Sequence, residues 1–288
     1  MKMPELINTP TYILNNLNIS NMSTFKKLYF LFVGSFYSQV EKLFTGAIYC
    51  FFINRLSFSK VTTEFKDNFY VVSENSDKFY YTNKRFTRML TGINNFSEHL
   101  ADAYLLNQIS FNKDDTVIDC GSNVGELYPY FYNLFPEINF IAFEPDREIY
   151  EALKQNFKFK NGISYKFGLS DIDDKKELFI DSLGADTSLE KNISSKSYKI
   201  EVKPLDFFKF KNVKLIKIDG EGHEEEILNG AKETLKNTKY VTIDHGPEKG
   251  PEQLRTTPEV FLSLMNSGFK PIASSKFREI TLFKNTNL

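Results

Sequence analysis

The sequence predicts an α/β fold, a doubly wound and mostly parallel sheet with an N-terminal extension. From residue 114 onward, short apolar runs alternate with helical patterns, as expected for parallel strands joined by crossover helices. Four of these runs end in or just before an acidic residue, which marks the carboxyl end of each of these predicted strands. The length of 288 residues suits one such domain and an extension.

The composition is that of a globular chain, with 41% hydrophobic and 25% charged residues. The net charge is −1, so no basic excess indicates nucleic acid as a partner. Cys50 and Cys120 form no CxxC pattern or disulfide framework, which fits a reducing, cytoplasmic location. Residues 1–21 lack the charged and apolar pattern of a signal peptide.

Residues 1–60 are predicted to form a helical extension with many aromatic residues. Val40, Phe44, Ala47 and Phe51 recur at helical spacing. The charge-free runs in this part are shorter than the roughly 20 apolar residues that span a bilayer. Two interpretations of the stretch 25–58 remain open. It is a helical cap packed on the catalytic domain or on a second subunit of a homo-oligomer, or it makes a peripheral contact with a membrane surface.

Residues 61–110 are predicted to lead into the main domain, which then covers residues 111–288. Alternating residues at 69–72 and 78–81 predict a hairpin. The segment that begins at Ser97 predicts a helix with that serine as its N-cap.

The first strand of the main domain, residues 116–120, leads into a glycine turn. Gly121 and Gly125 are separated by three residues. A strand, a glycine turn and a helix start together form a site for a ligand with polar groups. A dinucleotide-binding turn, G-x-G-x-x-G, needs glycine where this chain has Asn123, which disfavours a nicotinamide-dependent oxidoreductase.

The second strand, residues 139–143, is followed by Glu144. That acid lies 25 residues after Asp119, which is about the length of a strand and a crossover helix. An acid at the tip of this strand is placed to accept hydrogen bonds from ribose hydroxyls. Capping of the next helix is a compatible role.

The remaining elements follow from the same patterns. Further strands are predicted at 163–168, 214–218 and 239–244. Helices are predicted at 125–134, 147–156, 224–236 and 258–267. The segments 176–180 and 199–202 look extended, and the polar stretch 182–197 between them is predicted to be a loop.

A third motif, at Asp219, Glu221, Gly222 and Glu224, carries the pattern D-x-E-G-x-E. With IDCGSNVGE and FEPD before it, the run IKIDGEGHEEEILNGA resembles the FkbM-type family of S-adenosylmethionine-dependent methyltransferases. The resemblance covers roughly residues 70–284. It implies the class I methyltransferase fold, which is Rossmann-like, with a C-terminal antiparallel hairpin at residues 270–274 and 278–283.

The resemblance also implies a function. Members of this family methylate hydroxyls of sugars, glycolipids and polyketides, so an O-methyltransferase for a sugar, glycan or glycolipid is expected, with S-adenosyl-L-methionine as cofactor. A polyketide-like acceptor is one alternative. A degenerate methyltransferase fold that acts as a binding protein is another.

The expected cofactor residues follow the three motifs. The first turn is expected to hold the methionine end, Glu144 the ribose, and the segment after the third strand to border the adenine. The predicted set is Asp119, Gly121, Asn123, Gly125, Glu144, Ser170 and Asp171.

The acceptor is expected beyond the carboxyl ends of the fourth and fifth strands. His245 is the predicted base, Asp244 or Asp219 orients it or the acceptor, and His223 is the substitute base. Similar strand-end carboxylates hold magnesium in catechol-type O-methyltransferases, but direct catalysis without a metal is preferred because a histidine suits magnesium poorly. Histidines in exposed loops without a role remain the alternative.

Overall fold

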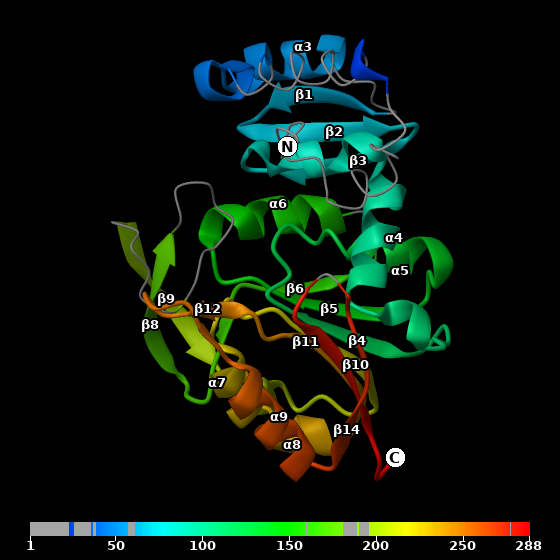
Figure 1. The fold of residues 1–288 in the computed structure, drawn as a ribbon, viewed down its shortest axis with the longest axis vertical. Coiled ribbons are helices and arrows are strands. Elements are labelled where there is room, and N and C mark those ends of the chain that lie inside the picture. The colour runs from blue at the N-terminus through cyan, green and yellow to red at the C-terminus, as the bar shows by residue number, and fades with distance from the viewer. Residues whose placement is uncertain are drawn as a thin grey trace. The chain divides into compact units, whose positions relative to one another are not determined.

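The computed structural model describes residues 23–25, 36, 39–56, 61–158, 161–180, 189, 196–276 and 278–288. The chain divides into two compact units, residues 1–99 and residues 100–288 (Figure 1). The division predicted from sequence, at residues 60 and 110, stays a prediction.

The first unit packs a helix and a three-stranded antiparallel sheet around aromatic side chains. Tyr70 stacks on Phe86 with ring centroids 4.9 Å apart, and Tyr49 of the helix meets Phe86 edge-on at 5.7 Å. The predicted hairpin is confirmed, and a further strand precedes it. The elements are α3 (Gly46–Leu56), β1 (Thr62–Lys66), β2 (Phe69–Glu74), β3 (Asp77–Tyr81) and the 3₁₀ helix η2 (Lys84–Thr91).

The residues of the extension that were predicted to share one helical face, from Val40 to Phe51, do not share it, so this prediction is wrong. Gly46 has a φ of +58° at the start of α3, so the helical face does not continue from Val40. Tyr49 is therefore buried, whereas Phe51 is 54% exposed. Much of the stretch 25–58 lies outside the described residues, and its contact with a membrane or a second copy stays a prediction. Within the described ranges, no helix combines the length and the apolar character needed to cross a membrane.

The prediction that Ser97 is an N-cap is also wrong. Helix α4 (Ile93–Ala103) begins one turn earlier, and Ser97 is buried inside it. The Glu74 side chain accepts a hydrogen bond from the Ile93 backbone N–H at 2.7 Å. A carboxylate from β2 thus satisfies a donor of the first turn, which sequence spacing does not reveal.

The second unit is built on a seven-stranded sheet in the order β14-β15-β11-β10-β4-β5-β6 (Figure 1). Neighbouring strands from β11 to β6 are parallel, and β15 runs antiparallel to both β11 and β14. The mostly parallel sheet and the C-terminal antiparallel hairpin are therefore confirmed. The strands are β4 (Thr116–Cys120), β5 (Asn139–Phe143), β6 (Ile163–Tyr165), β10 (Val213–Ile218), β11 (Thr238–Asp244), β14 (Phe269–Ser274) and β15 (Ile280–Asn285).

Helices cover both faces of this sheet. Val117 of β4 packs in one apolar cluster with α5 (Tyr128–Leu134) and α6 (Arg147–Phe157). The next residue, Ile118, packs in a second cluster with α7 (Glu224–Asn229), α8 (Lys232–Lys236) and α9 (Thr257–Asn266). Successive strand residues point to opposite faces, so one strand serves both cores and the sheet is doubly wound.

The helix predicted at 224–236 is two helices. The break falls at Gly230, where a β-carbon would overlap the Ser170 carbonyl oxygen. The new helix α8 is capped from outside, because the Asp206 carboxylate accepts hydrogen bonds from the backbone N–H groups of Glu233 and Thr234. Helix α5 begins at Tyr128 rather than at 125, because the preceding residues form the glycine turn.

The strand predicted at 163–168 is divided between two sheets. Its first part is β6, and its end becomes β7 (Gly168–Leu169) in a small sheet of order β7-β9-β8. The predicted extended segments are confirmed as β8 (Asp174–Ile180) and β9 (Lys196–Lys203). Most of the loop between them lies outside the described residues. A short ribbon of β12 (Pro247–Lys249) and β13 (Leu254–Arg255), which was not predicted, follows β11.

Candidate active site

The glycine turn after β4 is held by its two neighbouring strands. Gly121 has a φ of +73°, and a β-carbon there would overlap the Asp219 carbonyl oxygen at the end of β10. The backbone N–H groups of Gly121 and Ser122 donate to the Phe143 carbonyl of β5 at 3.2 and 3.0 Å. Glycine is therefore required at residue 121 by the packing of the backbone itself, whatever ligand the turn also meets.

Glu144 lies at the tip of β5 and is 6% exposed. Its Oε1 accepts a hydrogen bond from the Asp146 backbone N–H at 2.9 Å. Burial raises the pKa of Glu144 to about 8, and the Asp146 N–H partly opposes this shift. Donors from a bound ligand would stabilise the charged carboxylate, so this side chain suits a group with hydroxyls.

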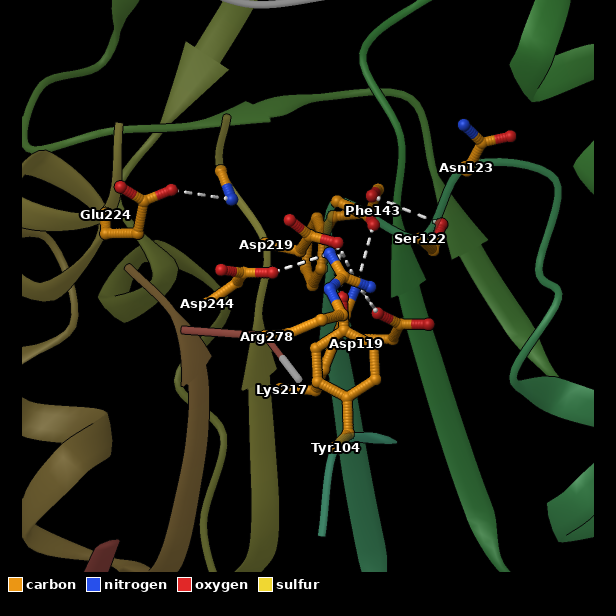
Figure 2. Close-up of polar contacts among 12 residues, drawn as sticks. Tyr104, Asp119, Ser122, Asn123, Phe143, Lys217, Asp219, Glu224, Asp244 and Arg278 are labelled. Carbon is orange, nitrogen blue, oxygen red and sulfur yellow. Dashed lines mark hydrogen bonds and ion pairs between the residues drawn. The ribbon is translucent and has the colours of Figure 1, made fainter. Parts of the chain in front are cut away.

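Asp119, Lys217 and Asp219 form a buried chain of charges across β4 and β10. Asp119 and Lys217 are neighbours in the sheet register, and their Oδ1 and Nζ atoms are 2.9 Å apart. Lys217 Nζ also donates to the Gly121 carbonyl at 2.8 Å and lies 3.7 Å from Asp219 Oδ2 (Figure 2). Burial alone would lower the pKa of Lys217, but Asp119 and Asp219 reverse this effect and leave it raised. Lys217 therefore stays charged and ties the turn to both carboxylates.

Tyr104, just after α4, lies between two cations. Its hydroxyl donates to Asp219 Oδ2, and its ring centroid is 5.1 Å from Lys217 Nζ and 5.6 Å from Arg278 Cζ (Figure 2). The Thr242 hydroxyl donates to the Tyr104 carbonyl at 2.8 Å. Burial, and next the negative charge of Asp219, raise the pKa of Tyr104 well above its usual value. The phenol therefore stays protonated and acts as a donor to Asp219.

Arg278 joins this cluster to the end of β11. Its guanidinium donates to Asp244 Oδ2 at 2.6 Å, and the Asp244 side chain is 4% exposed. Burial, and next Asp219, raise the pKa of Asp244, while Arg278 opposes the shift. The ends of β4, β10 and β11 thus share one network of alternating charges.

Glu224 closes the turn that carries the third motif. Its Oε1 accepts from the backbone N–H groups of Gly220 and Gly222 at 3.0 Å each, and its Oε2 accepts from the Thr256 hydroxyl at 2.8 Å. Burial raises the pKa of Glu224 to about 7. The Glu224 side chain thus holds the turn that precedes α7 and the residue before α9 together.

The two predicted bases are both buried. His245 is 7% exposed, and its two ring nitrogens lie 2.9 and 3.0 Å from the hydroxyls of Thr257 and Thr281. Burial lowers the pKa of His245. His223 is 3% exposed, and its Nε2 lies 3.1 Å from the Ser170 hydroxyl. Neither histidine is an exposed loop residue, and the contacts of His245 are those of a side chain that holds β11, β15 and α9 together.

Ser170 and Asp171, predicted to border the adenine, lie in different surroundings. Ser170 is fully buried, and its hydroxyl donates to Asp171 Oδ1 at 3.0 Å. Asp171 is exposed. The structure therefore brings Ser170 together with His223, which sequence reasoning had placed in another part of the site. Asn123 has a φ of +51°, and its side-chain oxygen accepts from the Val124 backbone N–H.

Three residues of this site were not predicted. Lys217 had a sequence signal, since it is a lysine inside the apolar run VKLIKI, two residues before Asp219 and therefore on the same face of β10. Tyr104 and Arg278 had none, because they lie outside every motif; Tyr104 is 115 residues from Asp219. Within the described part of the chain, no group of three or more His, Cys, Asp or Glu side chains is placed to hold a metal ion.

Several solved structures match part of this chain. They include methyltransferase FkbM from Methylobacillus flagellatus KT, with 16% identity, a TM-score of 0.43, and coverage of 70% of this chain and 55% of that one. TrmK from M. capricolum, solved with S-adenosyl-homocysteine, has 12% identity, a TM-score of 0.39 and coverage of 65% and 68%. A SAM-dependent methyltransferase from Aquifex aeolicus has 17% identity, a TM-score of 0.40 and coverage of 66% and 97%.

The chain thus spans 55% of the length of the Methylobacillus protein. No curated protein matches the sequence. The family model described as the methyltransferase FkbM domain matches residues 119–271, which is more than half of the 288 residues. That segment contains the acids of all three strand-end motifs. The chain therefore belongs to the FkbM family of S-adenosylmethionine-dependent methyltransferases.

Proposed function

We propose that this methyltransferase modifies a hydroxyl of a sugar, glycan or glycolipid. The observation that carries the proposal is the set of carboxylates at the ends of β10 and β11, where Asp219, Asp244 and Glu248 interact around Arg278. Carboxylates accept hydrogen bonds from the many hydroxyls of a carbohydrate.

The cofactor end of the proposed site lies at β4 and β5. Asp119 and the turn from Gly121 to Gly125, with Asn123 between them, would hold the methionine part, and Glu144 would accept hydrogen bonds from the ribose hydroxyls. The buried, raised-pKa carboxyl of Glu144 fits such a group, because hydroxyl donors would compensate its charge. When bound, S-adenosylmethionine supplies an electrophilic methyl group. Ser170 and Asp171 remain the proposed border of the adenine.

The acceptor end is proposed to use Asp219 and Asp244 to orient the acceptor hydroxyl. Both are fixed by other side chains: Asp219 by Tyr104 and Lys217, and Asp244 by Arg278. We assign His245 a positioning role, because the two threonine hydroxyls lie within hydrogen-bond distance of its ring nitrogens. His223 holds the segment around Ser170 against α7 in the same way.

The proposal is tested by cofactor binding followed by methyl transfer. Calorimetry should show that S-adenosylhomocysteine binds with a Kd of roughly micromolar order, about −8 kcal/mol. With methyl-labelled cofactor, label should then appear on methyl glycosides, nucleotide sugars or extracted glycolipids, and mass spectrometry should place it on oxygen. Label found only on a polyketide or on tRNA would contradict the proposed acceptor. Tight binding without transfer to any acceptor would favour the binding-protein alternative.

The proposed mechanism needs no metal ion, because Lys217 and Arg278 already neutralise the strand-end carboxylates. We expect the rate of methyl transfer to stay within about twofold after exhaustive treatment with a chelator. The measurement uses the best acceptor of the panel formed by the methyl glycosides, nucleotide sugars and extracted glycolipids. Its rate of methylation is measured in chelator-treated enzyme before and after addition of magnesium. A complete loss that magnesium restores would overturn the metal-free mechanism.

A further inference from the structure

Glu248 lies four residues after Asp244, on the ribbon of β12 and β13 that follows the fifth parallel strand. The ribbon approaches the third motif closely: a β-carbon at Gly222 would lie 2.7 Å from both the Glu248 carbonyl oxygen and the Lys249 Cα. Lys249 Nζ also lies 3.1 Å from Glu225 Oε2 of α7. The backbone that carries Glu248 is therefore fixed against the end of β10.

The other carboxylates of the acceptor end already accept hydrogen bonds from the protein. Asp219 accepts from Tyr104, and Asp244 accepts from Arg278. Glu224 accepts from two backbone groups and from Thr256. By contrast, the buried Oε2 atom of Glu248 has no hydrogen-bond partner among the described residues. A buried carboxylate oxygen without a partner is costly, so uptake of a proton by this carboxyl is favoured.

Gly246 leaves space between the two carboxylates of this turn. A β-carbon there would lie 3.4 Å from Asp244 Oδ1 and 3.7 Å from Glu248 Oε1. Both side chains therefore border the point that a larger residue would occupy. A hydroxyl at this point would lie beside Asp244, whose position is fixed by Arg278, and beside Oε1 of Glu248.

We propose that Glu248 is the base that takes the proton from the acceptor hydroxyl, an inference that rests on the proposed O-methyltransferase function. The acceptor oxygen gives its proton to Glu248 Oε1, and its lone pair forms the bond to the methyl carbon. The electrons of the broken carbon–sulfur bond stay on sulfur, so S-adenosylhomocysteine leaves as a neutral thioether. Glu248 then returns the proton to water.

The charges around Glu248 suit this role. Burial raises the pKa of Glu248 to about 8, and the negative charges of Asp219, Asp244 and Glu224 add to the shift, while Arg278 opposes it. A carboxylate with an ordinary pKa near 4.3 is a weak base, whereas one that titrates near neutral pH accepts a proton more readily. The charges on β10, β11, α7 and the β14–β15 hairpin thus all act on this carboxyl.

The test compares Glu248→Gln with Glu252→Gln, an exposed glutamate on the same ribbon. On the best acceptor of the panel, Glu248→Gln should lower kcat by about 10²- to 10⁴-fold, whereas Glu252→Gln should leave it within about twofold. Both variants should bind S-adenosylhomocysteine like the wild type. The wild-type kcat should rise with pH through about 8, since the base must be deprotonated, and Glu248→Gln should lack this rise.

A second measurement needs no acceptor. With ¹³C-labelled glutamate carboxyls, the resonance that disappears in Glu248→Gln should titrate near pH 8 in the wild type. A wild type that methylates no panel member would refute the proposed function, and the titration would still decide whether Glu248 is an available base. A resonance that titrates near 4.3 would overturn the inference, as would an active Glu248→Gln with an unchanged pH profile.

Discussion

Replacing Lys217 with methionine is expected to lower the free energy of unfolding by about 3–5 kcal/mol at pH 8, because it leaves a buried carboxylate without its cation. Asp119 is 1% exposed and Lys217 Nζ is 2.9 Å from it, so water cannot take the place of the ammonium group. Asp119 can avoid part of this cost by taking up a proton, so the loss should be smaller at pH 5. Urea unfolding at both pH values measures it.

Two variants make this prediction specific. Lys214→Met removes a lysine from the other end of the same strand, where Asp115 is 3.2 Å away but more exposed, so its cost should be clearly smaller. Asp119→Asn combined with Lys217→Met removes both charges and should recover most of the loss. If Lys217→Met is as stable as the wild type at pH 8, the buried pair does not hold the turn in place.

The sequence predicted the parts of the fold that local patterns determine. The bounds of β4 and β5 agree with the prediction because each strand is a short apolar run that ends in an acid. The strand predicted at 163–168 failed because its two ends pair with different sheets, which no local pattern records. The break in the helix at Gly230 depends in the same way on the Ser170 carbonyl, 60 residues earlier in the chain.

In the candidate site, too, local sequence patterns could not predict contacts between residues far apart in the chain. The motifs correctly indicated which strand ends carry acids, since parallel strands bring their carboxyl ends to one edge. They could not show which of these acids already has a partner. Asp219 accepts a hydrogen bond from Tyr104, and Asp244 accepts one from Arg278. The partners of His245 are the hydroxyls of Thr257 and Thr281. The distinction between a positioned and an available group is therefore a property of tertiary structure.

A balance between binding and stability follows from the raised pKa values. Glu144 and Glu248 titrate near 8, and Glu224 near 7. A carboxyl whose pKa is higher in the folded state holds its proton there after the unfolded chain has lost it. The contribution of this carboxyl to the free energy of unfolding is fully present below its pKa in the unfolded chain. It is lost as the pH rises through its pKa in the folded state. These carboxylates therefore weaken the fold at the pH at which ligand donors would use them.

Glu144→Gln is expected to make the protein more stable and a poorer binder of cofactor. The pKa of Glu144 rises from 4.5 to about 8 on folding, so its ionisation costs on the order of 5 kcal/mol at pH 9. The variant should therefore unfold at higher urea than the wild type at pH 9 and at nearly the same urea at pH 5. Glu151→Gln, an exposed pair partner of Lys154 on α6, should change stability little at either pH.

Binding should change in the opposite direction. If Glu144 accepts the ribose hydroxyls, Glu144→Gln should weaken S-adenosylhomocysteine binding by about 1.5–3 kcal/mol at pH 9, or roughly 10- to 150-fold. In the wild type, the affinity should rise with pH through about 8, and binding below that pH should release a proton. Calorimetry in buffers of different ionisation enthalpy detects this proton, which the variant should not release. Equal affinity of both proteins at every pH would remove Glu144 from the ribose site.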